Sequence, residues 1–155
     1  MPVLTLEELG KSVPADKRIL GLDLGSKTIG LAISDATKTI ASPRELVRRT
    51  KFKRDAEAIW KFVDENDVGA LLFGLPVSMD GREGPRCQST RDFANNLLSM
   101  RDVPAAFWDE RLSTAAVERV LVREADMTRK RRAEVVDKTA AAYILQGALD
   151  ALSAR

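Results

Sequence analysis

The sequence predicts an α/β protein built on a mixed five-stranded sheet, in which a three-stranded antiparallel meander is joined to two parallel strands and helices cover both faces. Two observations support this class. Three short strand-like runs follow one another near the start of the chain, which is typical of a meander. After them, helical periodicity alternates with apolar runs of strand length, which is typical of parallel strands. The predicted order is therefore strand, strand, strand, helix, strand, helix, strand, helix, helix.

A hairpin should open the domain, with strands at residues 19–24 and 28–34 and a turn at residues 25–27. Asp23 interrupts the apolar run of the first strand, on the face that also carries Gly21. A lone aspartate beside glycine is most often a turn residue. Asp23 lies within the strand rather than after it, which favours a functional role, and the small neighbour leaves room for a positively charged partner.

The remaining elements follow from the same periodicities. Pro43 suggests that the third strand is an edge strand or carries a bulge. The stretch Ala70–Leu75 is almost wholly apolar, as expected for a central parallel strand. Residues 1–17 form an N-terminal extension to a single domain at residues 18–155. The predicted elements are a short helix at 4–9, a strand at 39–47, an amphipathic helix at 54–67, strands at 70–75 and 105–108 separated by a helix at 86–100, a helix from Ser113 or Thr114 to Glu124, a polar loop at 126–132 and a helix at 133–152.

The composition excludes several kinds of chemistry. The 155 residues include no histidine, which excludes a Ser-His-Asp triad, a histidine general base and a histidine metal site. An enzyme of this composition must rely on carboxylates, which select hard cations such as Mg²⁺ or Mn²⁺. Cys87 is the only cysteine, so no intrachain disulfide can form and a reducing cytoplasm fits. No apolar run of about 18 residues predicts a membrane span, and the first residues do not resemble a signal peptide.

Three carboxylates lie where the predicted topology could bring them to one edge of the sheet. Asp23 is on the first strand, Asp137 is near the start of the final helix, and Glu110 follows the last strand, where open α/β sheets place their sites. Clustered carboxylates repel one another, so at least one pKa should rise unless cations are bound. Two divalent ions about 4 Å apart would offset the repulsion and suit phosphodiester hydrolysis. Each residue also has a simpler explanation. Asp23 could be a turn aspartate, Asp137 a carboxylate that stabilises the start of a helix, and Glu110 one member of a surface ion pair with Arg111.

Basic residues are bunched, although the net charge is only +2. Five of them lie within residues 48–54, and residues 129–132 are all basic. A single basic run is most often a solvated face. Two such runs flanking a possible metal site indicate a polyanionic partner such as nucleic acid.

The chain resembles the YqgF family of bacterial proteins, also called RuvX, over nearly all of residues 18–152. Four spaced motifs carry the resemblance, and they read GLDLGSKTIGLAISD, FGLPVSMDGREGP, FWDERLSTAAVERVL and VDKTAAAYILQGALD. The family has an RNase H-like fold. Its members are described both as Holliday-junction resolvases and as nucleases that mature the 5′ end of precursor small-subunit ribosomal RNA. The resemblance therefore implies an RNase H-like nuclease that depends on Mg²⁺ or Mn²⁺, with two ions expected.

The acidic positions of the family motifs fall on Asp23, Glu110 and Asp137, so the resemblance implies that these residues are catalytic and hold the metal ions. It also implies that Arg111 and the loop at residues 74–84 lie near the scissile phosphate. Two positions depart from the family pattern, since Thr28 stands where arginine is common and Gly147 where an aromatic residue is common. The first departure removes one possible phosphate contact. Further residues are expected near the site: Lys27, Lys138, Arg131 and Arg132 as nucleic-acid contacts, and Asp109 and Asp35 as supports for the metal ligands.

The leading functional hypothesis is a metal-dependent endonuclease that processes the 5′ end of precursor 16S ribosomal RNA in the cytoplasm, with ribosomal precursor particles as partners. A resolvase of four-way DNA is the first alternative, and it would need two active sites and hence a symmetric dimer. A nucleic-acid-binding module without catalysis is the second, although carboxylates repel phosphate unless metal ions intervene. A small ATPase related to actin and sugar kinases is disfavoured, because those proteins close two domains over the nucleotide and this chain has room for one.

Overall fold

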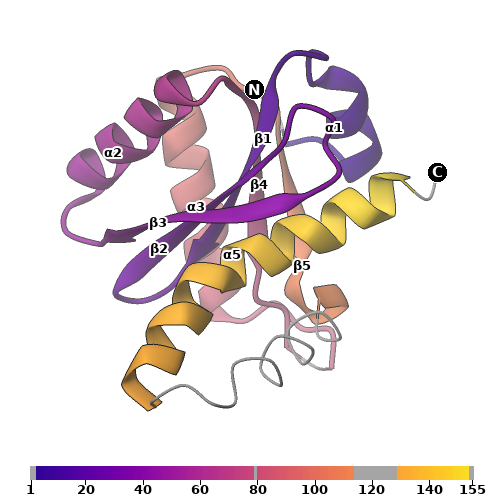
Figure 1. Cartoon of the computed structure of the whole chain (residues 1–155). Helices are drawn as coiled ribbons and strands as arrows, with labels where there is room; N and C mark the ends of the chain where they lie inside the picture. The colour runs from indigo at the N-terminus through magenta and orange to yellow at the C-terminus, as the bar shows by residue number, and fades with distance from the viewer. Residues whose placement is uncertain (1–2, 79, 114–128, 154–155) are drawn as a thin grey trace.

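The structure is a computed structural model that describes residues 3–78, 80–113 and 129–153, with the backbone alone described for residues 113 and 129–139. Its sheet has the strand order β3-β2-β1-β4-β5 (Figure 1). β1 pairs antiparallel with β2, and β2 with β3, whereas β1 pairs parallel with β4, and β4 with β5. The predicted mixed sheet is confirmed. The elements are α1 (Leu6–Ser12), β1 (Arg18–Leu24), β2 (Thr28–Ser34), β3 (Ala41–Arg48), α2 (Phe52–Glu65), β4 (Val68–Leu75), α3 (Pro85–Met100), β5 (Ala105–Asp109), the 3₁₀ turn η1 (Glu110–Ser113) and α5 (Arg129–Ser153).

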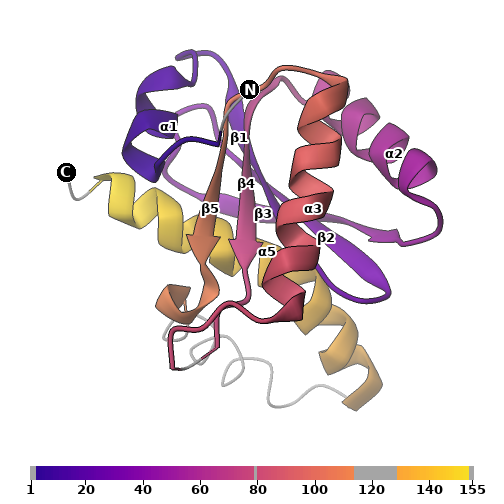
Figure 2. The same ribbon diagram turned by 180° about the vertical axis from the view of Figure 1, so that it is seen from behind.

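Helices cover both faces of the sheet, as predicted (Figures 1 and 2). On one face α2 and α3 pack on strand residues that include Leu22 and Phe73. On the other face α1 and α5 pack on residues that include Ile19 and Leu72. Successive residues of a strand point to opposite faces, so Asp23 lies on the α5 face of β1, in line with Ile19.

Two glycines allow α5 to approach the sheet closely. A Cβ atom at Gly21 would lie 2.9 Å from Cβ of Leu145 and 3.3 Å from the carbonyl oxygen of Ala141. A Cβ atom at Gly74 would lie 2.6 Å from Cδ1 of Ile144. Any larger residue at these positions would push the helix away from the sheet. α5 therefore crosses directly over the middle of β1 and the carboxyl end of β4.

The first 17 residues contribute to the core. A capping box between Thr5 and Glu8 begins α1, two residues later than predicted. Leu9 is fully buried in the apolar cluster that α5 covers. Leu4 adds a parallel bridge to Ala106 on the outer edge of β5. This bridge covers part of one of the two edges of the sheet.

The polar loop predicted at residues 126–132 is wrong in its last four residues, because α5 already begins at Arg129. Arginine and lysine are good helix formers, so a run of them indicates solvent exposure rather than the absence of a helix. The helix predicted from Ser113 or Thr114 to Glu124 lies outside the described residues, apart from Ser113, which ends η1.

Within the described ranges, none of the helices combines the length and the apolar character that a membrane span requires.

Candidate active site

Parallel strands end together at one edge of the sheet, and two of the predicted acidic residues meet there. Asp23 is the next-to-last residue of β1, and Glu110 follows β5 as the first residue of η1. Figure 2 shows β4 and β5 ending side by side, above η1 and the loop that follows β4. The side chains of Asp23 and Glu110 are hydrogen-bonded to each other. Both residues are partly exposed, so the pair is open to solvent.

The carboxyl group of Glu110 holds its proton unusually tightly. Burial and the neighbouring charge of Asp23 raise its pKa to about 7, while the guanidinium group of Arg86 acts in the opposite direction and offsets only part of the rise. Two carboxyl groups this close cannot both ionise without a large repulsive cost. In the absence of a cation the pair therefore favours one shared proton. The rise in pKa predicted for clustered carboxylates is confirmed for Glu110.

Gly74 makes this contact possible. β4 lies between β1 and β5 in the sheet, so Glu110 must reach across β4 to contact Asp23. A Cβ atom at Gly74 would lie 2.8 Å from Oε1 of Glu110 and 3.3 Å from its Cγ. The Glu110 side chain therefore lies over the bare backbone of Gly74, with Ile144 of α5 packed beside it. Sequence reasoning assigned this glycine to the end of a central strand and the start of a loop, and it did not predict the contact with Glu110.

We expect Gly74→Ala to destabilise the protein by about 1–3 kcal/mol, because the added methyl group must displace either Glu110 or α5. Urea denaturation of the metal-free protein would measure this loss. Gly84→Ala is a matched control, since an added Cβ there meets no heavy atom within 4 Å. It replaces only the N-cap glycine of α3 and should cost less than about 1 kcal/mol. Equal losses in the two variants would contradict the crossing of Glu110 over Gly74.

Asp137, the third predicted carboxylate, belongs to α5, but its side chain lies outside the described residues. It precedes Ala141, whose carbonyl oxygen approaches Gly21, by four residues, or about one turn. Among the described side chains, no group of three or more carboxylates or cysteines is arranged to hold a metal ion. The triad of Asp23, Glu110 and Asp137 therefore stays a prediction, of which the structure brings the first two together.

Arg111 is paired with Asp109 through a forked contact. Its Nε lies 3.0 Å from Oδ2 of Asp109 and its Nη2 lies 2.6 Å from the same oxygen. The backbone N–H of Arg111 also donates to Oδ1 of Asp109, at 3.0 Å. Hydrogen bonding with Arg111 lowers the pKa of Asp109, and the same contact raises the pKa of Arg111. A Cβ atom at Gly81 would lie 3.9 Å from Nη1 of Arg111, so the loop after β4 lies against this arginine. Their contact with a scissile phosphate stays a prediction.

The role predicted for Asp35 is wrong. Asp35 follows β2, whose last residues pair with the beginning of β1, at the opposite end of the sheet from Asp23. Its carboxylate accepts hydrogen bonds from Thr37, Thr39 and Ile40, and these bonds lower its pKa to about 2. Asp35 therefore stabilises the turn between β2 and β3.

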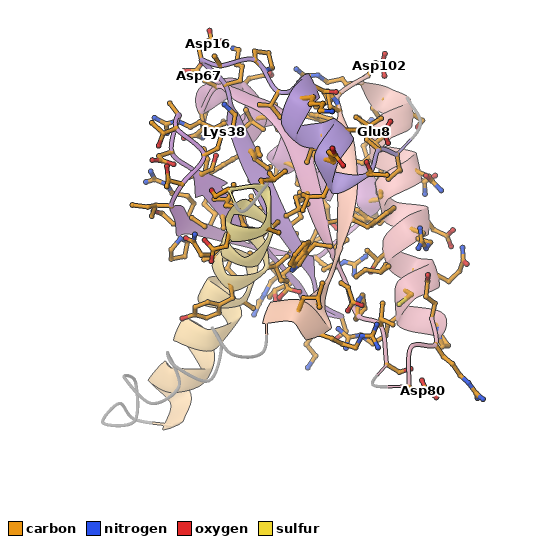
Figure 3. The ribbon with its side chains drawn as sticks, turned by 90° about the vertical axis from the view of Figure 1, so that its right-hand side faces the viewer. Glu8, Asp16, Lys38, Asp67, Asp80 and Asp102 are labelled. Carbon is orange, nitrogen blue, oxygen red and sulfur yellow. The ribbon has the colours of Figure 1, made fainter. Side chains whose placement is uncertain are left out.

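Of the basic residues predicted to contact nucleic acid outside η1, the structure describes the side chain of Lys27 alone. Lys27 is exposed in the turn between β1 and β2, at the same edge as Asp23. Figure 3 shows Asp80, in the loop after β4, at one end of the molecule and Asp16 and Asp67 at the other. The side chains of Arg131, Arg132 and Lys138 lie outside the described residues. Their contacts with nucleic acid stay predictions.

Sequence reasoning missed Arg86, which is in the first turn of α3 and whose charge acts on Glu110. A signal was present, because Arg86 begins the helix that follows β4 and the start of that helix must lie near the carboxyl end of the strand. Arg49 was seen only as one member of a basic run. Arg49 follows the last residue of β3 and lies beside the turn between β1 and β2. The sequence pattern does not reveal this position, because it depends on the residue at which β3 ends.

Comparison with known proteins places this chain in a family. The family model described as RuvX, Holliday junction resolvase, matches residues 17–151. A protein of Paramagnetospirillum magneticum, provisionally named a pre-16S rRNA nuclease, is 65% identical over 150 residues, which cover 97% of this chain and 96% of that protein. A protein of Rhodospirillum rubrum with the same name is 57% identical and covers 98% and 94% of the two chains.

The fold itself is similar to that of RuvC from Thermus thermophilus. The structure of RuvC in complex with a Holliday junction substrate superposes with a TM-score of 0.54 at 15% identity, over 87% of this chain and 94% of that one. A second structure of Thermus thermophilus RuvC gives a TM-score of 0.52 at 13% identity. At this level of identity the likeness concerns the RNase H-like fold alone. Together with the family match, the motifs and the acidic pair at the strand ends, it leads to one conclusion: the chain belongs to the RuvX family.

Proposed function

We propose that this protein is a divalent-metal-dependent endonuclease that hydrolyses a phosphodiester bond of nucleic acid at the edge where Asp23 and Glu110 meet. The observation that carries the proposal is the pairing of these two carboxyl groups across Gly74. A protein has little structural reason to hold two acidic side chains in contact at a solvent-open edge. The raised pKa of Glu110 shows the electrostatic cost of doing so when no cation is present.

The residues at this edge fit a hard divalent cation such as Mg²⁺ or Mn²⁺. Carboxylate oxygens are the ligands that these ions prefer, and a cation between Asp23 and Glu110 would replace their shared proton. Asp137 is the third proposed ligand, because helical periodicity places position 137 one turn before Ala141, on the side of α5 that meets β1. Bound ions of this kind supply an activated water and stabilise the charge that develops on a phosphate.

Other residues of the chain would position the substrate. Arg111 is held by Asp109 and lies against the loop after β4, so its guanidinium group is fixed in place before substrate arrives. A preorganised cation needs little rearrangement to stabilise a phosphate in the transition state. We assign Arg111 to the contact with the scissile phosphate and Asp109 to the positioning of Arg111.

We propose precursor 16S ribosomal RNA as the substrate, cut at its 5′ end in the cytoplasm within ribosomal precursor particles. The names of the relatives from P. magneticum and R. rubrum support this choice. The description of the family supports a second candidate, the resolution of Holliday junctions. A resolvase would have to act as a symmetric dimer, because two strands of the junction must be cut.

One experiment distinguishes the two candidates. The purified protein is incubated with Mn²⁺, or with chelator, and with a precursor 16S rRNA fragment and a four-way DNA junction in parallel. Cutting of the RNA alone at a defined 5′ position, abolished by chelator, is the expected result. Symmetric nicks in the junction alone would establish the resolvase instead. If neither is cut faster by the wild type than by Asp23→Asn, the proposed endonuclease is overturned.

A further inference from the structure

A cleft of about 240 Å³ opens beside the acidic pair. One wall is the turn after β1, at Leu24, Gly25 and Ser26, which follows Asp23 directly in the chain. The opposite wall is the first turn of α3, and Arg49 lies between the two. Of the described residues, those that line the cleft include no aspartate or glutamate, and they are Leu24, Gly25, Ser26, Arg49, Pro85, Arg86, Ser89 and Thr90.

Arg49 is held rigidly in this cleft. Its backbone N–H donates to the carbonyl oxygen of Lys27 at 2.8 Å, and its Nη1 donates to the carbonyl oxygen of Gly25 at 2.7 Å. The guanidinium carbon lies 5.5 Å from the centre of the Phe93 ring, within the range of a cation–π contact. One guanidinium nitrogen is thus used within the protein. No other hydrogen bond of this guanidinium group is formed with the residues that the structure describes, so its remaining donors can bind a ligand.

The turn that presents Arg49 is itself fixed. The N–H and Oγ1 of Thr50 both donate to Oδ1 of Asp55, at 3.0 and 3.3 Å. Asp55 is only 3% exposed and lies in the first turn of α2. A ligand that binds Arg49 therefore meets an arginine whose backbone and side chain are already ordered, which reduces the entropic cost of binding.

The arginines of the cleft form no direct ion pair with any acidic side chain that the structure describes. Within the described part of the chain, neither Arg49 nor Arg86 has a carboxylate within 4.0 Å. The N-terminal end of α3 adds a partial positive charge to the same space. Arg86 is also close enough to Glu110 to act on its charge, so the cleft and the acidic pair belong to one continuous surface. Guanidinium groups in a cleft without carboxylates are suited to a phosphate, which they can bind through two donors at once.

We propose that this cleft binds a second, uncleaved backbone phosphate of the nucleic-acid strand, with Arg49 as its principal ligand and Arg86 and the hydroxyl of Ser89 as further contacts. The substrate class rests on the proposed function, but the site itself is separate from the acidic pair. A strand held by this phosphate would be fixed in direction and in register over Asp23 and Glu110. The cleft thus decides which phosphodiester bond faces the carboxylates.

Binding measurements test the subsite without depending on catalysis. A fluorescein-labelled fragment of precursor 16S rRNA is titrated with full-length Asp23→Asn protein in Mg²⁺, and the anisotropy is followed at several KCl concentrations. Adding Arg49→Gln should weaken binding about tenfold and reduce the slope of log K against log [salt] by about one. Arg44→Gln is the charge-matched control, because Arg44 is exposed on β3 and does not line the cleft. Equal losses for Arg44→Gln and Arg49→Gln would overturn the subsite.

A second pair of variants leaves the contacts of Arg49 intact, so that loss of the hydrogen bonds from Arg49 to the β1–β2 turn cannot imitate the result. Ser89→Asp places a negative charge in the cleft, whereas Asn95→Asp places the same charge at an exposed position of α3 outside it. Binding should weaken at least fivefold more in the first variant than in the second. Equal affinities of these two variants would also overturn the proposal.

Neutral phosphate analogues locate the contact on the strand. We compare the binding of labelled strands to the Asp23→Asn protein. Each strand carries one methylphosphonate, a neutral replacement for a backbone phosphate, next to a 2′-deoxy nucleotide. One position outside the scissile bond should lose affinity, and the same position should lose none in the variant that also carries Arg49→Gln. Loss at that position in both proteins would overturn the assignment to Arg49. If the wild-type protein cleaves no substrate but these binding differences are observed, the proposed reaction fails and the phosphate subsite stands. If the protein cleaves its substrate but the binding differences are absent, the phosphate subsite fails and the proposed reaction stands.

Discussion

Asp23→Asn should lower the rate of cleavage at least about 1,000-fold at saturating Mg²⁺. Replacing one carboxylate oxygen by an amide nitrogen removes a charged ligand, and metal ions of this type contribute several kcal/mol of transition-state stabilisation, with about 1.4 kcal/mol for each factor of ten. The amide occupies nearly the same volume at a partly exposed position, so the fold should be retained. Single-turnover cleavage with excess enzyme would measure the loss at the chemical step.

Asp16→Asn is the matched control for this prediction. Asp16 is exposed and lies at the far end of the molecule from Asp80 and the loop after β4 (Figure 3). The Asp16→Asn substitution removes the same charge as Asp23→Asn but leaves the acidic pair unchanged, so cleavage should stay within about twofold of the wild-type rate. Asp23→Asn protein that keeps more than a tenth of the wild-type rate would contradict a metal ligand at this position.

Glu110→Gln should abolish cleavage to a similar degree and, at the same time, stabilise the metal-free protein at pH 8. The pKa of Glu110 is about 7 in the folded protein, compared with an ordinary value of 4.5. Between these two values the folded state binds more protons than the unfolded state, so stability falls as the pH rises through this window. Above pH 7 the full penalty of the ionised pair is present. An amide removes the penalty, and because Glu110 is partly exposed we expect a gain of about 1–2 kcal/mol rather than the full value of the shift.

Urea denaturation in chelator, at pH 4.5 and at pH 8, measures this second effect. The wild-type protein should lose stability between the two pH values, and the variant should lose less. Near pH 4.5 the two proteins should differ little, because Glu110 is then protonated in the folded state and still about half protonated in the unfolded state. A variant that is less stable than wild type at pH 8 would show that Glu110 has a structural role rather than a strained position at a metal site.

Much of the architecture could be predicted because it depends on local patterns. The position of Asp23 within the apolar run of β1 was sufficient to place it on the same face as Ile19, since alternation along a strand is strictly periodic. Glu110 could be placed at the edge of the sheet because the apolar run before it ends at that point. These two residues then meet in the structure as predicted.

The features that could not be predicted depend on contacts between residues that are distant in the sequence. Nothing local distinguishes Gly74, which allows Glu110 to cross β4, from a glycine that only begins a loop. Asp35 and Asp23 both adjoin strand ends, and only the pairing of β1 with β2 shows that they lie at opposite ends of the sheet. The pairing of Arg49 with the carbonyl oxygen of Gly25 likewise joins residues 24 positions apart. Periodicity assigns residues to faces, but it does not select partners across the fold.

We propose that Asp23, Glu110 and Asp137 form a single metal site, and calorimetric titration with Mn²⁺ tests this proposal most directly. Wild-type protein is titrated at pH 8 beside Asp23→Asn, Glu110→Gln and Asp137→Asn, with Asp16→Asn as control. We predict that Mn²⁺ binds the wild type and the control alike, and that each of the three site variants weakens binding at least about tenfold. Wild-type affinity for Mn²⁺ in Asp137→Asn, or equal affinity in all five proteins, would contradict the shared site.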